Sequence, residues 1–242
     1  MSKTTRAKRT APKAKKTRGA KPLPAAAAPA AETSCPRPGH VLILRTCDAA
    51  LRAYGGFQWP SSGPVAAPDW RPTRECGWGL HGFLWGEGKG DLASWESTAK
   101  WLVVEVSSST IVDLDGKVKF PSGVVVHCGS RESATTFLAE HGGAGRAIVG
   151  GTATAGPRGT ATAGDGGTAT AGDGGTATAG DGGTATAGEN GEIRIRYYDP
   201  RRGRYRDRVG FVGEDGLEPA TAYILDESSP PKFVRKPEQS GG

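Results

Sequence analysis

His81 is the side chain whose sequence context is best suited to chemistry. It lies in residues 75–88, where closely spaced glycines allow the backbone to approach a ligand and the imidazole can titrate near neutral pH. This segment is part of a loop-rich stretch, residues 54–90, that holds four of the six tryptophans, and loops carry functional residues more often than strands do. The alternative is a turn region that its tryptophans pin over a sheet.

The cysteines are a second group that could do chemistry. A zinc site is chemically possible from nitrogen and sulfur ligands at Cys47, Cys76, His81 and Cys128. None of the four cysteines, Cys35 included, forms a C-x-x-C pair, so the spacing favours small buried side chains over a metal site. In a chain without a recognisable signal peptide, we expect these thiols to be reduced. We predict no metal site.

Arginines form a third group, near the carboxyl end. Residues 192–198 and 204–212 are strand-like runs joined by residues 199–203, and pairing Tyr198 with Arg204 predicts a β-hairpin. In that register one face carries Arg194, Arg196, Arg206 and Arg208. Like charges directly across a strand pair destabilise it. We interpret this face either as covered by nearby acids or as an anion-binding surface, since guanidinium groups bind phosphate and carboxylate well.

The elements that position these residues follow a basic amino-terminal arm. Nine of the 31 lysines and arginines, and none of the 25 acids, fall in residues 1–31, which leaves 22 basic and 25 acidic residues in the remainder. Residues 1–37 therefore read as a disordered basic arm, and residues 3–21 as a possible polyanion contact, with a solubilising arm as the alternative. No stretch is apolar enough to span a membrane, so we expect a cytoplasmic protein without membrane contact.

Residues 38–145 read as an α+β domain. Strand-length apolar runs cover residues 41–46, 101–106 and 124–128, and the Asp115-Gly116 turn predicts a pair of strands over 111–114 and 117–120. Ser130 is a helix cap for a short helix that buries Ala134, Phe137 and Leu138. A second helix is predicted over residues 92–100.

Residues 151–190 are five tandem octapeptides, G-T-A-T-A-G-x-x, beginning at Gly151. Because side chains alternate along a strand, the alanines share one face and the threonines the other. Ile193 and Ile195 continue the alanine positions, so we expect the alanines to face inward in a thin β-solenoid. The outward face would carry Thr152, Thr154, Thr160, Thr162, Thr168, Thr170, Thr176, Thr178, Thr184 and Thr186.

Two parts of the chain resemble known families. The motifs VLILRTCD, GGFQWP, CGWGLHG, WLVVEV and DGKVKF in residues 41–129 resemble an uncharacterised domain family of bacteria and phages (DUF7666-like), which implies a shared fold and no established activity. The octapeptides resemble those of bacterial ice-nucleation proteins, whose T-x-T rows order water. Five copies give only two or three rungs on each face, so a rigid spacer is favoured over ice binding.

A third resemblance is enzymatic. In mono-ADP-ribosyltransferases, an Arg or His ending a first strand, a G-[LI]-[HY] motif and a later Glu together bind NAD. The corresponding residues here are Arg45, Gly79-Leu80-His81 and Glu105, and the resemblance implies that the glutamate stabilises an oxocarbenium-like centre. The alternative is that Glu105 points to solvent from a half-exposed strand. The transferase interpretation requires Arg45, His81 and Glu105 to converge in one cleft.

These observations predict a predominantly β chain: an α+β domain, a short β-solenoid and a carboxyl-terminal β-hairpin. The expected boundaries are 1–37 (arm), 38–145 (α+β domain), 146–198 (repeats with a cap), 199–227 (hairpin and one strand near residues 222–226) and 228–242 (disordered tail). The favoured function is that of a non-catalytic binding or structural protein without a cofactor. The alternatives are an NAD-dependent transferase and a weak ice-binding protein.

Overall fold

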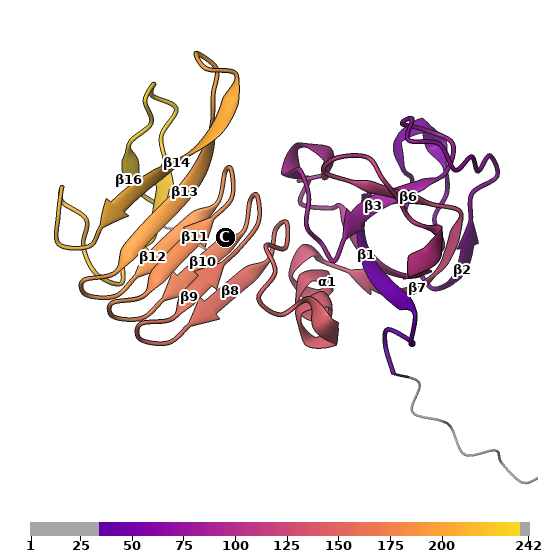
Figure 1. Ribbon diagram of the computed structural model, residues 1–242, viewed down its shortest axis with the longest axis horizontal. Helices are drawn as coiled ribbons and strands as arrows, with labels where there is room; N and C mark the ends of the chain where they lie inside the picture. Colours follow the sequence, from indigo (N-terminus) through magenta and orange to yellow (C-terminus); the bar gives the residue numbers. More distant parts are fainter. Residues whose placement is uncertain (1–33, 238–242) are drawn as a thin grey trace, which may run out of the picture. The chain divides into compact units, whose positions relative to one another are not determined.

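The first half of the chain is an antiparallel sheet. The computed structural model describes residues 34–237, and in it seven strands follow the order β2-β7-β4-β1-β3-β6-β5 (Figure 1). Their bounds are His40–Cys47 (β1), Gly63–Ala66 (β2), Leu80–Leu84 (β3), Lys100–Ser107 (β4), Val112–Asp113 (β5), Val118–Phe120 (β6) and Ser122–Gly129 (β7). All the pairs in this sheet are antiparallel.

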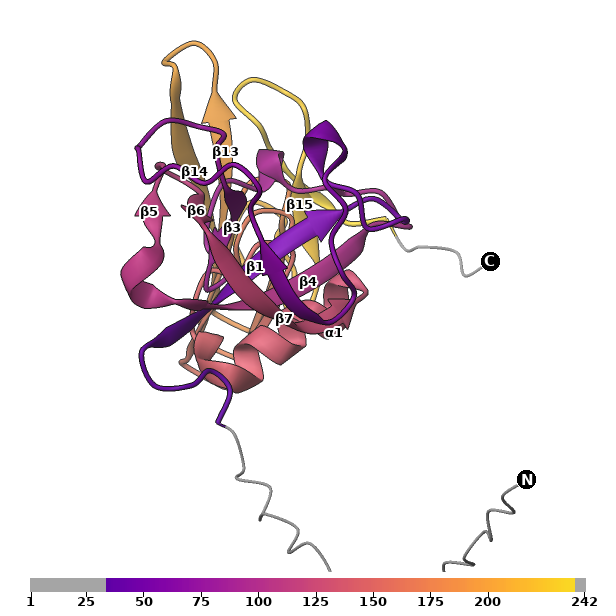
Figure 2. The ribbon, with the colours of Figure 1, turned by 90° about the vertical axis from the view of Figure 1, so that its right-hand side faces the viewer.

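The central strands β1 and β4 are apolar on both faces because both faces are covered. They pair from His40 opposite Ser107 to Cys47 opposite Lys100. One face packs against loop residues that include Trp59, and the other packs against helix α1, Arg131–Leu138, which lies beside β4 and β7 (Figure 2). The helix begins as expected, since the hydroxyl of Ser130 accepts a hydrogen bond from the backbone N–H of Ser133.

The predicted helix over residues 92–100 does not form. Only a short 3-10 turn, Gly90–Leu92, is present before β4. The backbone N–H of Ser94 donates to the Thr46 hydroxyl, and the indole N–H of Trp95 donates to the Gly90 carbonyl. The chain leaves this turn at Ala93, whose backbone is extended, and the contacts of Ser94 and Trp95 stabilise that path, so tertiary structure overrides local propensity. Other short helical turns are Tyr54–Gly56, Ser108–Thr110 and Ala139–Gly143.

The octapeptides form two further sheets of parallel strands. Alternate repeats pair with one another: the first sheet contains β8, β10 and β12, and the second contains β9 and β11 followed by β13. The register joins residues 16 positions apart, such as Thr168 and Thr184. The bounds are Thr152–Ala155 (β8), Thr160–Thr162 (β9), Thr168–Ala171 (β10), Thr176–Ala179 (β11), Thr184–Ala187 (β12) and Glu192–Asp199 (β13).

The repeat turns explain the Asp-Gly pair that ends each of the three middle octapeptides. Gly166, Gly174 and Gly182 have positive φ angles, the left-handed conformation that glycine adopts without strain. The carboxylate of Asp165 accepts a hydrogen bond from the backbone N–H of Asp181, and Asp173 does the same for Glu189. Successive turns are therefore linked at the same 16-residue spacing as the strands.

Alanines fill the space between the two parallel sheets. Ala169, Ala177 and Ala185 are completely buried, and Ile193 and Ile195 continue the same cluster. The small side chains let the two sheets approach closely, because no large group has to be accommodated between them. The first repeats also contact the preceding domain, where the backbone N–H of Gly90 donates to the Asp165 carboxylate.

Antiparallel strands follow the last repeats. β14, Arg204–Phe211, pairs with β13, while β15, Tyr223–Leu225, pairs with β12 and with β16, Phe233–Arg235. The predicted tail, residues 228–242, is therefore not structureless throughout, because Phe233 packs against the alanine cluster. Residues 238–242 and the basic segment 1–33, including the predicted polyanion contact at 3–21, lie outside the described residues.

Candidate functional site

Two of the three residues in the transferase prediction lie at one cavity. Arg45 in β1 and His81 in β3 both line a space of about 900 Å³, and the Arg45 guanidinium lies 3.4 Å from the His81 carbonyl oxygen. The loops on either side contribute aromatic residues, among them Phe57, Trp59 and Trp78. Arg45 also lies over the Trp59 ring, with its central carbon 5.9 Å from the ring centroid.

The cavity is a positive environment. Lys117 lines it, and Lys119 lies beneath the neighbouring loop, fully buried and bonded to the Glu75 carbonyl at 2.8 Å. Burial, together with the charges of Lys117, Arg45 and Lys119, lowers the pKa of His81 from 6.5 to about 4. The imidazole is therefore neutral at neutral pH, because both desolvation and nearby cations disfavour its charged form.

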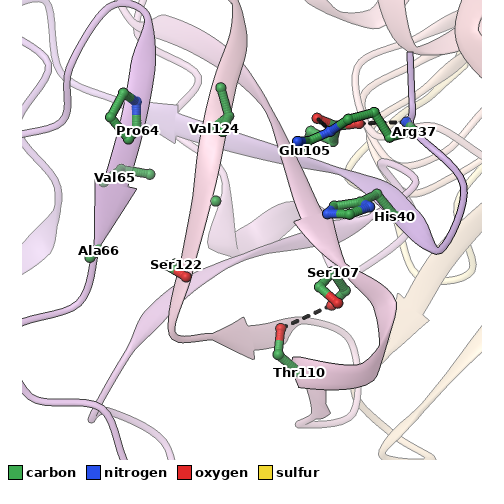
Figure 3. Close-up of a pocket in the computed structure, with 11 residues that line it drawn as sticks. Arg37, His40, Pro64, Val65, Ala66, Glu105, Ser107, Thr110, Ser122 and Val124 are labelled. Carbon is green, nitrogen blue, oxygen red and sulfur yellow. Dashed lines mark hydrogen bonds and ion pairs between the residues drawn. The ribbon is translucent and has the colours of Figure 1, made fainter. Parts of the chain in front are cut away.

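Glu105, the third member of the predicted trio, lies elsewhere. It pairs with Leu42 in β1 and faces the α1 side of the sheet, whereas its neighbours Val104 and Val106 face the side of Trp59. Figure 3 shows its carboxylate meeting Arg37 beside His40, at the edge of a separate pocket of about 420 Å³. The backbone N–H and the side chain of Arg37 donate to it at 2.5 and 2.9 Å.

The transferase constellation is therefore not assembled. Arg45 and His81 share a cavity, but Glu105 is on the opposite face and engaged by an arginine. Glu105 does not point to solvent either, because it is only 5% exposed. The Glu105 carboxylate instead holds Arg37 in place. Because Arg37 is the last residue of the predicted disordered arm, that end of the arm is structured.

Of the four cysteines, Cys76 alone lines the cavity with His81. Cys47 is buried, Cys76 lies exposed at the cavity and Cys128 is half-buried in β7; together with Cys35, all are free thiols. Within residues 34–237 no cluster of three or more histidine, cysteine or acidic side chains could hold a metal ion. No helix in the same range is long and apolar enough to cross a membrane.

The four arginines of the hairpin do not share one face. Tyr198 pairs with Tyr205 rather than with Arg204, which shifts the predicted register by one residue. Arg194 and Arg196 then lie opposite Val209 and Asp207, while Arg206 and Arg208 occupy the other face. The observed register brings the rings of Tyr198 and Tyr205 into edge contact, with their centroids 5.3 Å apart, a cross-strand pair that stabilises it.

The threonine faces of the repeats differ in exposure along the chain. Thr152, Thr154 and Thr160 are exposed, and the later threonines are half-buried between neighbouring rungs. Thr184 departs from the predicted outward row because it is only 6% exposed. Its strand, β12, is the repeat strand that pairs with β15, where Ala185 lies opposite Tyr223.

Comparisons with known proteins find two kinds of similarity in this chain. Residues 41–138 match the family model of a domain of unknown function, DUF7666. Both Arg45 and His81 thus lie in the DUF7666 match. In addition, 103 residues of the chain are 38% identical to ice nucleation protein InaU of Pantoea ananas, and 100 residues are 42% identical to an ice nucleation protein of Pseudomonas syringae.

These relatives are much longer than this chain. The matched stretches are 42% and 40% of this chain but only 10% and 9% of the two relatives. No solved structure matches the chain.

The resemblances drawn from the sequence motifs, to DUF7666 and to ice-nucleation proteins, are confirmed. The aromatic cavity was not predicted, although two of the four tryptophans in the loop-rich stretch, Trp59 and Trp78, line it.

Proposed function

We propose that this protein is a non-catalytic binding and structural protein whose octapeptides form a short, rigid β-solenoid. The observation that carries the proposal is the pairing of alternate repeats at 16-residue spacing, with alanines buried between the two sheets. Two octapeptides then make one coil, and the strands of successive coils are stacked about 4.8 Å apart. Such a stack is a spacer that holds a domain at one end.

Two features of the described chain support a stack of fixed length. The DUF7666-like domain contacts the first coil, where the backbone N–H of Gly90 donates to the Asp165 carboxylate. At the other end β14 and β15 pair antiparallel with β13 and β12. The last parallel strands of the stack, β12 and β13, are therefore covered by antiparallel partners, which opposes the addition of further strands at that end.

Lengthening the repeat tests this proposal. Five further copies of residues 167–182, inserted after residue 182, should extend the maximum dimension measured by small-angle X-ray scattering by about 24 Å. Each inserted copy should also increase the β-sheet signal in the far-ultraviolet circular dichroism spectrum. A matched insert with the same composition in scrambled order should add neither. A repeat insert that behaves like the scrambled one would show that the octapeptides do not form a solenoid.

Weak ice binding is a second candidate, supported by the similarity to ice nucleation proteins and by the exposed Thr152, Thr154 and Thr160. Threonines two apart in a strand are about 6.7 Å from each other, so stacked rows form a lattice of hydroxyl and methyl groups. Freezing of droplets containing the natural and lengthened proteins tests it. Activity that rises with added coils supports ice binding, and freezing identical to buffer in both contradicts it.

A further inference from the structure

Three buried side-chain nitrogens within residues 34–237 have no hydrogen-bond partner, and all three belong to residues of one cavity wall. They are Arg45 Nε, Trp59 Nε1 and His81 Nε2. A buried polar atom without a partner costs about 1–3 kcal/mol. The gathering of three such atoms at one cavity is therefore characteristic of a binding site whose ligand completes the hydrogen bonds.

The chemistry of these atoms describes the ligand. Arg45 Nε and Trp59 Nε1 carry hydrogens and can only donate, so they require acceptor atoms. Two cations, Arg45 and Lys117, line the cavity against one carboxylate, Asp69. Since His81 is held neutral, the excess charge is positive and favours a ligand with an anionic group.

The aromatic residues add a requirement for shape. Phe57 and Trp59 meet edge to face, with ring centroids 5.7 Å apart, and Trp78 is 41% exposed with the Arg71 guanidinium stacked on its ring at 3.9 Å. Aromatic faces of this kind bind planar rings by stacking. The cavity volume, about 900 Å³, is near the upper end of small-molecule sites.

We propose that this cavity binds a planar aromatic molecule that carries a carboxylate or phosphate group and is about the size of a nucleotide. The ring stacks on Trp78, the exposed tryptophan of the cavity, and the anionic oxygens accept hydrogen bonds from Arg45 and Trp59. This site is independent of the octapeptide repeats and of the structural role proposed for them. Binding of such a molecule requires no catalytic carboxylate. The position of Glu105 on the opposite face of the sheet is therefore compatible with this site.

Calorimetric titration of the full chain with two matched pairs of probes tests this site. The phosphate pair is adenosine monophosphate and adenosine, and the carboxylate pair is indole-3-acetate and indole-3-acetamide. We expect the anion of at least one pair to bind about tenfold more tightly than its neutral counterpart. The pair that shows the difference identifies the anionic group. Ribose 5-phosphate, which has the charge without the ring, should bind no more tightly than the neutral probes.

Variants connect the binding to the cavity. Lys117→Gln removes a lining charge and should weaken the preferred anion about fivefold or more, whereas Lys100→Gln, at the exposed start of β4 and outside the cavity, should leave affinity within about twofold. Trp78→Ala, at an exposed position, should weaken the anion and its neutral counterpart alike. Equal affinities for anionic and neutral probes, no binding of either anion, or equal effects of the two lysine variants would overturn the proposal.

Discussion

Arg196 lies directly opposite Asp207 in the β13–β14 pair. In the register predicted from the sequence, Arg206 lies opposite Arg196. The observed register differs by one residue and so replaces two like charges by opposite charges. Arg206 instead reaches the other face, where its guanidinium is 3.6 Å from the carboxylate of Asp199. Arg194, Arg196 and Arg206 thus each lie near an acid of the same hairpin.

Replacing Arg196 and Arg206 together by threonine should therefore lower the free energy of unfolding. We expect a loss of about 1 kcal/mol, because both pairs are partly exposed and each contributes little. Urea denaturation measures the change, with Arg201→Thr as a control whose side chain forms no ion pair within residues 34–237. An increase in stability would mean that the arginines repel one another, as in the predicted register.

The inward face of the repeats has a matched pair of tests in β10. Ala169 is completely buried between the sheets and Thr170, its neighbour, faces outward. Ala169→Phe should overpack the thin core and lower stability by about 3 kcal/mol, whereas Thr170→Phe should change it much less. Thermal unfolding of both variants compares them. Similar melting temperatures would show that alanine is not the packing face.

The sequence was sufficient for the parts of the fold that follow a local period. Alternating threonine and alanine predicts the two faces of each repeat strand, and the apolar runs predict β1 and β4, since burial on both faces requires apolar residues throughout. The hairpin register was missed because it depends on cross-strand contacts of Tyr198 and Tyr205 rather than on local pattern. Likewise, nothing local to Glu105 indicates that Arg37 approaches it from another part of the chain.

Stability should depend on pH through His81. Its folded-state pKa, about 4, is below the ordinary value of 6.5, so the unfolded chain takes up the proton first. The free energy of unfolding should therefore fall as pH drops from 6.5 towards 4 and level off below that. His81→Gln should remove about 1 kcal/mol of this fall, a modest amount because the ring is partly exposed. Parallel stability curves for the two proteins would contradict the burial of a neutral imidazole.

The contact between Arg37 and Glu105 should stabilise the first sheet. Arg37→Gln removes the charge facing a carboxylate that is 5% exposed, and we expect a loss of about 1–3 kcal/mol in urea denaturation. The double variant with Glu105→Gln should recover part of the loss, since no buried charge then remains. An unchanged midpoint in Arg37→Gln would indicate that the carboxylate has another partner.

Disulfide trapping is the most direct test of the stacked repeats. Thr170 and Thr186 are paired across adjacent parallel strands, 16 residues apart, while Thr178 belongs to the other sheet. Adjacent strands lie about 4.8 Å apart, within the span of a disulfide. Under mild oxidation, with peptides identified by mass spectrometry, cysteines at 170 and 186 should form a bond and cysteines at 170 and 178 should not. A bond in the second pair and none in the first would contradict the two-octapeptide coil.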